Sequence, residues 1–143
     1  MGRGYVLDAW ALLAFIQAEE PAASRVRGLL EAGKQPRTEA ITLSVINLGE
    51  IYYSIGRRHG ELPARSIVAA IRQLPLAILP ATDERVLAAA SLKSRHRLAY
   101  ADAFAAAASD ELGATLLTGD PELLNLAGIL DIEPLNRSSP AGG

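Results

Sequence analysis

Four carboxylate residues occupy positions in the sequence that helix ends and solvated surfaces do not fully explain. They are Asp8, Glu50, Asp102 and Asp120, and each lies beside or inside an apolar segment. Carboxylates gathered at one place repel each other unless a cation neutralises them. Oxygen ligands in a chain without cysteine favour Mg²⁺ or Mn²⁺. Such ions bridge phosphate oxygens and activate water, so the residue types predict a metal-dependent site for phosphate chemistry.

Two of these carboxylates also have a simpler explanation as helix caps. Asp8 follows a short apolar run and precedes an apolar pattern of helical spacing, where an Asp side chain accepts hydrogen bonds from free N–H groups. Asp120 is followed by Pro121 and Glu122, which is a favourable sequence for a helix start. Capping and metal binding both remain open for these two residues.

The other two carboxylates lie within predicted helices. Glu50 shares a polar stripe with Asn47, Ser54 and Arg57, and a solvated helix face is an equally good explanation for it. Asp102 lies in the first turn of an alanine-rich helix, whose small side chains allow close packing against its neighbours. A carboxylate buried there without a counter-charge would be costly, which favours a functional role.

The elements that position these residues alternate between strands and helices along the chain. Apolar runs predict strands at 6–7, 39–43, 76–79 and 114–118, with a last edge strand at 129–132. Helical patterns cover 9–17, 21–33, 45–56, 63–74, 82–92, 100–112 and 121–126. This alternation predicts an α/β fold with a mainly parallel central sheet of about four to five strands and helices on both faces. In such a sheet Asp8 and Asp120 both emerge at the carboxyl edge, where α/β proteins bind ligands.

Composition limits the class of protein further. The 143 residues suit one domain, and half of them are hydrophobic although only 5% are aromatic. The net charge of −2 argues against a basic protein that coats nucleic acid, but it allows a local basic patch. No apolar run approaches the roughly 20 residues of a membrane span, and the apolar N-terminal stretch lacks a convincing cleavage site. We therefore expect no membrane association and a cytoplasmic location.

Four segments in this order resemble the PIN domain, the nuclease family to which VapC-type toxins belong. The segments are Val6-Leu7-Asp8-Ala9-Trp10-Ala11-Leu12-Leu13, Asn47-Leu48-Gly49-Glu50-Ile51, Tyr100-Ala101-Asp102-Ala103-Phe104-Ala105 and Leu117-Thr118-Gly119-Asp120-Pro121. The resemblance extends to about residue 135, so we expect a single PIN-like nuclease domain over 1–135 and a flexible C-terminal tail over 136–143. It implies a three-layer α/β/α fold.

The resemblance also implies a role for each of the four acids. Asp8, Glu50 and Asp102 correspond to the core ligands of Mg²⁺ or Mn²⁺, and Asp120 to a fourth acid that binds a second ion or positions water. Thr118 corresponds to the supporting small hydroxyl residue two positions before that acid. Trp10 departs from the family, because many members carry Ser, Thr or Asn there to support the pocket.

Basic residues near two of the acids are candidate RNA contacts. They are Arg57 and Arg58 after Glu50, and Lys93, Arg95 and Arg97 before Asp102. Because RNA must be drawn to an acidic pocket, cations around that pocket are expected. Cations are also favourable at helix C-termini in any protein, and this alternative explains both groups equally well.

The function predicted from the resemblance is cleavage of RNA phosphodiesters by a metal-dependent endoribonuclease. Membership among VapC-like toxins implies a homodimer and a cognate antitoxin protein as partner. Two alternatives are a housekeeping RNA-processing nuclease and a non-catalytic RNA- or protein-binding PIN module. A phosphatase or dehalogenase with Asp8 as nucleophile is weakened by Trp10, which stands where the phosphatases have a second acid.

Overall fold

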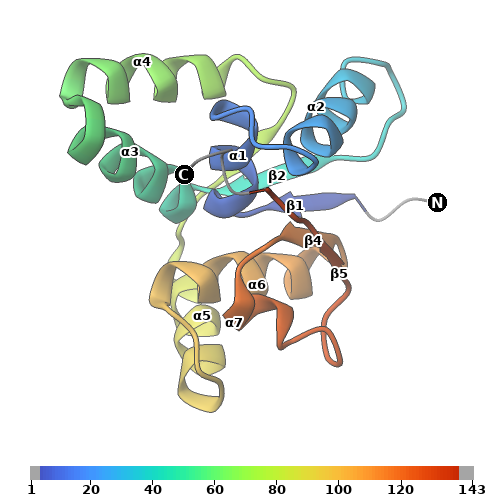
Figure 1. Cartoon of the computed structure of the whole chain (residues 1–143). Coiled ribbons are helices and arrows are strands. Elements are labelled where there is room, and N and C mark those ends of the chain that lie inside the picture. Colours follow the sequence, from blue (N-terminus) through green and yellow to red (C-terminus); the bar gives the residue numbers. More distant parts are fainter. Residues whose placement is uncertain (1–3, 139–143) are drawn as a thin grey trace.

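Residues 4–138, the part of the chain that the computed structural model describes, form a parallel sheet between two groups of helices (Figure 1). The five strands are β1 (Tyr5–Leu7), β2 (Ile41–Ser44), β3 (Ala77–Leu79), β4 (Thr115–Thr118) and β5 (Ile132–Pro134), in the spatial order β3-β2-β1-β4-β5. The helices are α1 (Ala9–Ile16), α2 (Ala22–Ala32), α3 (Val45–His59), α4 (Glu61–Arg72), α5 (Asp83–Arg95), α6 (Tyr100–Leu112) and α7 (Pro121–Leu124). None of these helices is long and apolar enough to cross a membrane.

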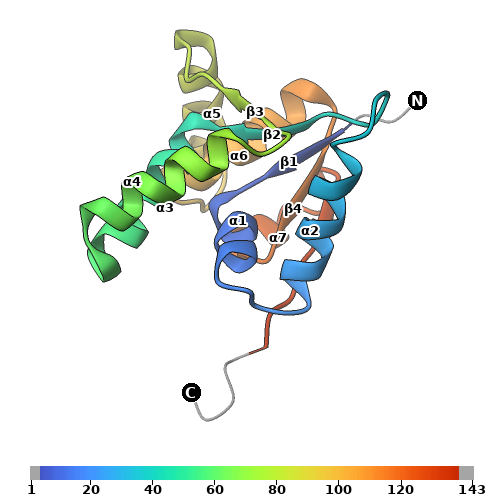
Figure 2. The same ribbon diagram turned by 90° about the horizontal axis from the view of Figure 1, so that it is seen from above.

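Alternating side chains on the central strands build two separate cores. Leu7, Leu43 and Leu117 point to one face, where they pack with apolar residues of α1 to α4. Val6 and Leu116 point to the opposite face, where they pack against α6 and its neighbours. Successive residues of a strand face opposite ways, so a strand of three or four apolar residues is buried on both sides. Figure 2 shows β1 and β4 at the centre of this arrangement.

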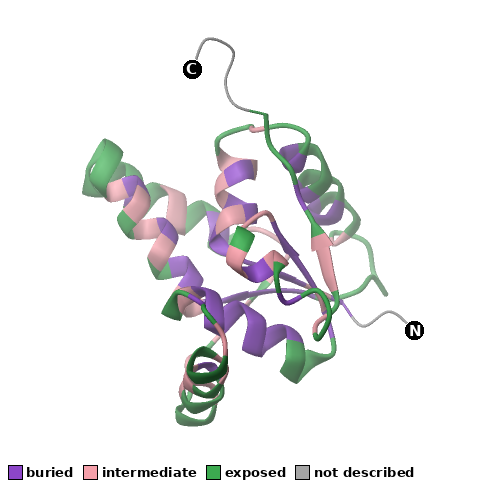
Figure 3. Cartoon of the chain, turned by 60° about the horizontal axis from the view of Figure 1, so that its bottom comes forward, coloured by how far each residue is buried: buried purple, intermediate pink, exposed green. Residues whose placement is uncertain are grey.

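Helix α6 is the most deeply buried helix of the second layer. Its residues from Asp102 to Ser109 are all buried, whereas α5 has a single buried residue, Ala89 (Figure 3). Alanine side chains allow this close approach, because they add little bulk between the helix and the strands. α6 consequently contacts β1, β2 and β4 as well as α3. Its first turn, which carries Asp102, is thus held at the sheet.

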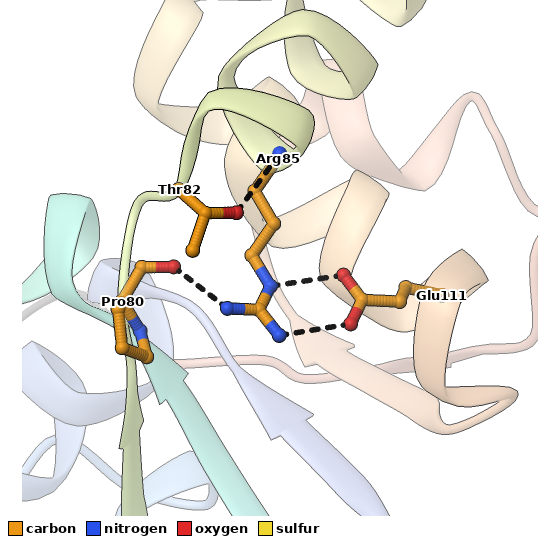
Figure 4. Close-up of polar contacts among 4 residues, drawn as sticks. All are labelled: Pro80, Thr82, Arg85 and Glu111. Carbon is orange, nitrogen blue, oxygen red and sulfur yellow. Dashed lines mark hydrogen bonds and ion pairs between the residues drawn. The ribbon is translucent and has the colours of Figure 1, made fainter.

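A charged fork fixes the outer helix α5 to this buried helix. Arg85 donates hydrogen bonds from Nε and Nη2 to the two carboxylate oxygens of Glu111, both at 3.0 Å (Figure 4). Its Nη1 donates to the carbonyl of Pro80 at 3.1 Å, and Thr82 caps the same helix by accepting from the Arg85 N–H. The start of α5 is therefore tied both to the end of β3 and to the end of α6.

The predicted fold class is confirmed, and the bounds of some elements differ. The predicted last edge strand exists as β5, but its predicted bounds of 129–132 are wrong, since β5 occupies Ile132–Pro134. The Ile129 and Leu130 N–H groups instead both donate to the Leu126 carbonyl, which makes a turn of that stretch. The helix predicted from residue 63 already begins at Glu61, because Gly60 adopts a positive φ of 93° and starts it.

The segment before the C-terminus lies against the loop between α1 and α2. The Ala22 N–H donates to the Asn136 carbonyl at 3.0 Å, and the Ser138 N–H donates to the Glu20 carbonyl at 2.9 Å. Of the predicted tail over 136–143, residues 139–143 lie outside the described residues.

Candidate active site

Neighbouring strands bring Asp8 and Thr118 together at the carboxyl edge of the sheet. β1 pairs with β4 so that Leu7 lies beside Leu117. The residues that follow these two, Asp8 and Thr118, therefore also lie side by side. The Thr118 hydroxyl donates a hydrogen bond to Asp8 Oδ2, and both side chains are buried. Parallel pairing thus joins two residues that are 110 positions apart in the sequence.

Asp8 acts as a helix cap and is also buried next to other acids. Its Oδ1 accepts a hydrogen bond from the Ala11 N–H at 2.8 Å, as expected for the N-cap of α1. Only 1% of the residue is exposed. Burial raises the pKa of Asp8 to about 7, and the charges of Asp102 and Asp120 add to this, while the bonds from Thr118 and Ala11 oppose it. The two hydrogen bonds to Asp8 therefore stabilise its ionised form less than burial destabilises it.

Three further carboxylates converge with one another, and two of them, Asp102 and Asp120, act electrostatically on Asp8. Asp102 from the first turn of α6 and Asp120 and Glu122 from the start of α7 each offer one oxygen, and these oxygens lie within 4.8 Å of one another. The pKa of Asp102 is raised to about 7, first by burial and then by the charges of Asp120, Glu50 and Glu122. Helix starts from two different elements therefore direct negative charge to one point.

Glu122 is a member of this cluster that the sequence analysis did not select. The sequence interpretation assigned it to an ordinary helix start after Asp120. In the structure its Oε1 accepts a hydrogen bond from the Ala99 N–H at 3.1 Å, at a position where α6 has no side-chain cap of its own. The signal that could have found it is the second acid two residues after Asp120, at the end of a buried strand.

Glu50 is held at the edge of the cluster by Asn47, one turn earlier in α3. Asn47 Nδ2 donates to Glu50 Oε1 at 3.3 Å and to the Ala101 carbonyl at 3.1 Å, which links α3 to the residue before Asp102. Asn47 is completely buried, and its Oδ1 has no hydrogen-bond partner among the described residues. The pKa of Glu50 is raised, mainly by burial, with an added contribution from Asp120.

Trp10 supports the site by packing on the main chain rather than by polar contact. A Cβ atom at Gly119 would lie 2.3 Å from the indole ring, so this turn requires glycine. The guanidinium of Arg137 lies over the Trp10 ring, 4.7 Å from its centroid. The indole therefore presses on the turn that carries Asp120, in place of the small polar residue common in the resembled family.

The predicted RNA contacts are distributed between two surfaces. Arg57 and Arg58 are exposed in the last turn of α3. Lys93 donates to the Leu98 carbonyl at 2.7 Å, which closes the loop between α5 and α6, and Arg95 reaches the Ser91 hydroxyl at 3.5 Å. Arg97 is exposed in that loop. None of the ion pairs found in residues 4–138 includes any of these five cations.

The donor set fits a divalent cation. Five carboxylates, those of Asp8, Glu50, Asp102, Asp120 and Glu122, lie at one edge of the sheet, and within residues 4–138 none of them forms an ion pair with a basic side chain. Carboxylate oxygens are the ligands that Mg²⁺ and Mn²⁺ prefer. A bound cation would stabilise the ionised forms of Asp8, Glu50 and Asp102, whose pKa values are raised first by burial and then by neighbouring acids.

The parallel sheet with acids at its carboxyl edge defines an α/β domain of the kind that binds divalent cations. A sequence model of the PIN domain matches residues 5–129. The chain therefore belongs to the PIN-domain family, as the four motifs predicted. A search among curated proteins finds no match to the sequence.

Solved structures with the same fold include several toxin–antitoxin proteins. VapBC2 from Rickettsia felis, bound to a DNA fragment from its promoter, has a TM-score of 0.70 and 16% identity over 92% of this chain and 98% of that chain. VapC20 from Mycobacterium tuberculosis, a toxin that cleaves the sarcin–ricin loop, has a TM-score of 0.69 and 20% identity over 92% and 100%. FitAcB from Neisseria gonorrhoeae has a TM-score of 0.63 and 20% identity over 91% of this chain and 97% of that chain. At these identities the likeness shows a shared fold.

Proposed function

We propose that this chain is a Mg²⁺- or Mn²⁺-dependent endoribonuclease and the toxin of a VapBC-type toxin–antitoxin pair. The observation that carries the proposal is the cluster of carboxylates without a basic partner within residues 4–138, in which the pKa values of Asp8 and Asp102 are raised. Asp8, Glu50, Asp102 and Asp120 are the proposed catalytic acids and metal holders, and Glu122 joins them. A divalent ion bound there would supply a water of lowered pKa and charge stabilisation for the phosphate.

The residues of the chain hold this proposed site rigidly before any substrate binds. The Ala11 N–H and the Thr118 hydroxyl fix the two oxygens of Asp8. Asn47 orients Glu50, and the Ala99 N–H fixes one oxygen of Glu122. Preorganised ligands favour catalysis, because they need little reorganisation as charge develops on the phosphate. The basic residues on α3 and before α6 serve to attract the RNA backbone.

The partner assignments of this proposal are an antitoxin protein and a second copy of the chain. Structures with this fold include VapBC toxin–antitoxin complexes, which supports an antitoxin partner. An apolar groove of about 230 Å³ between α1 and α4, which Phe15, Ile16, Ile67, Ile71 and Leu74 line, offers a surface for a protein partner. The cytoplasm, where RNA and antitoxin are both present, is the proposed location.

Cleavage of defined RNAs by the purified protein tests the proposal. A panel of tRNA, rRNA fragments and mRNA is incubated with Mg²⁺, with Mn²⁺ or with EDTA. We expect discrete cuts that disappear with EDTA and with Asp102→Asn. Glu111→Gln is the matched control, since Glu111 lies outside the site and is paired with Arg85, and it should cleave like the wild type.

Two outcomes would contradict this function. A folded, antitoxin-free preparation that cleaves none of the RNAs would favour the non-catalytic PIN module. Cleavage that survives both EDTA and Asp102→Asn would remove the acid cluster from the reaction. An antitoxin reading frame directly upstream would distinguish the toxin from a housekeeping RNA-processing nuclease.

A further inference from the structure

A stacked pair on α3, Tyr53 and Arg57, is exposed to solvent and unexplained by the packing of the fold. Tyr53 is 52% exposed, and the Arg57 guanidinium lies over its ring, 5.5 Å from the centroid. The chain has only seven aromatic residues, and some of the others pack within the fold. Trp10 packs on Gly119, for example, and Phe104 is buried against the ring of Tyr100.

The position of the pair along α3 connects it with the acidic site. Tyr53 and Arg57 lie three and seven residues after Glu50, so all three are on one side of the helix. With a rise of 1.5 Å per residue, the pair lies about 4.5 to 10.5 Å along the helix axis from Glu50. A chain of nucleotides whose phosphate reaches the acids would thus place an adjoining base near the ring.

The charge of this surface is opposite to that of the acidic site. Arg57, Arg58 and His59 form the last turn of α3, and the ion pairs found in residues 4–138 include none of them. A cation that stacks on an aromatic ring and has no carboxylate partner matches a ligand with both a flat base and a negative backbone. A protein whose net charge is −2 needs such a local attraction to hold RNA beside five carboxylates.

We propose that Tyr53 and Arg57 form a subsite that stacks an unpaired base of the RNA next to the cleaved phosphate. The inference rests on the proposed nuclease function and assigns to these two residues the contact with a base beside the acidic site. Bases in a duplex are stacked on each other and are not free to pack on this pair. The subsite therefore discriminates by strandedness, and it does not require a particular base, because every base has a flat face.

Kinetics and binding with a single-stranded RNA oligonucleotide and its duplex test this subsite. We expect Tyr53→Ala to raise KM for the single strand about 10-fold, since one lost base–aromatic stack has an effect of this size. Tyr53→Phe and Tyr53→Trp should restore it, because both retain a flat ring. Leu87→Ala is the control, as Leu87 is 68% exposed on α5, away from this side of the molecule. Affinity for Mn²⁺ should be the same in all variants.

The result that overturns the subsite is an unchanged KM for Tyr53→Ala. A change in oligomeric state by light scattering would also overturn it, because the ring would then belong to a protein interface. Fluorescence anisotropy of a labelled single strand separates this inference from the proposed function. If wild type cleaves RNA and Tyr53→Ala binds it equally well, only the subsite fails. If wild type cleaves other RNAs but binds no single strand, only the subsite fails as well, and if it cleaves none of the RNAs, both fail.

Discussion

Carboxylates in two regions of this molecule differ in what balances their charge. At the junction of α5 and α6, Glu111 is paired with Arg85 through two hydrogen bonds, and this arginine lowers the pKa of Glu111. At the carboxyl edge of the sheet, Asp8 and Asp102 face other acids, and burial raises the pKa of each to about 7. The fold supplies a basic side chain, Arg85, as the partner of Glu111. Among residues 4–138 it supplies no basic partner to the acids at the sheet edge.

This difference has opposite consequences for stability. A carboxylate whose folded pKa is lowered stabilises the protein above its unfolded pKa and loses that contribution as the pH falls. A carboxylate whose folded pKa is raised takes up more protons in the folded state, so its ionisation reduces stability as the pH rises. The ion pair around Glu111 thus stabilises the protein at neutral pH, whereas the ionised acids at the sheet edge destabilise it there.

The largest predicted effect is the pH dependence of the metal-free protein. The pKa of Asp8 rises from 3.8 to about 7 on folding, so its contribution to the free energy of unfolding falls as the pH rises through this window. The loss amounts to about 4 kcal/mol, at 1.36 kcal/mol per pKa unit. Urea unfolding in EDTA from pH 4 to pH 8 should show Asp8→Asn gaining this stability relative to wild type.

Two controls test this first prediction further. Added Mn²⁺ should remove most of the pH dependence of the wild type, because a cation offsets the charge of the ionised cluster. Glu111→Gln should show no gain with rising pH, since the pKa of Glu111 is shifted in the other direction. A wild type and an Asp8→Asn variant with parallel stability curves would show that Asp8 is not strained.

The second prediction concerns metal affinity. Asp102→Asn keeps the size of the side chain but removes one charge from the three carboxylates that lie within 4.8 Å of one another. We expect Mn²⁺ affinity to fall by at least about 100-fold, the upper end of the range for residues that only support ligands. Isothermal titration at pH 7.5 measures it, with Glu111→Gln as the variant that binds like wild type. Equal Mn²⁺ affinity in Asp102→Asn and wild type would place any ion elsewhere.

The sequence predicted those residues of the acidic site that directly follow a strand. Apolar runs before Asp8 and Asp120 identified two strands, and parallel pairing places the residues at their carboxyl ends side by side. The spacing of residues in the sequence does not predict that Glu50 and Asp102 lie at that edge. The family resemblance predicted their position. The structure does so through Asn47, which bonds both Glu50 and the Ala101 carbonyl.

Other features escaped the sequence because they depend on the packing of distant segments. Glu122 was hidden by a sufficient local explanation, since an acid at a helix start needs no further role. The position of Trp10 depends on the absence of a side chain at Gly119, more than a hundred residues away. The edge strand was misplaced because Ile129 and Ile132 are equally apolar, and only the turn at Leu126 decides between them.

The third prediction concerns Asn47, the residue that positions Glu50. Asn47→Ala removes the bonds to Glu50 and to the Ala101 carbonyl, so the carboxylate loses its fixed orientation. We expect Mn²⁺ affinity to fall about 10-fold, the lower end of the range for residues that orient metal ligands. Ser54→Ala, one turn beyond Glu50 on the same stripe, is the control. If both variants bind Mn²⁺ like wild type, Asn47 serves the packing of α3 alone.

The smallest predicted effect comes from the charged fork itself. Glu111→Gln leaves one oxygen to accept from Arg85, and Arg85 keeps its bond to the Pro80 carbonyl. Partly exposed ion pairs contribute little, so we expect the melting temperature at pH 7.5 to fall by at most about 4 °C. The difference should shrink as the pH falls through the lowered pKa of Glu111, because the wild-type carboxylate is then protonated as well. A larger fall that does not shrink with falling pH would mean that this junction depends on more than its local charge balance.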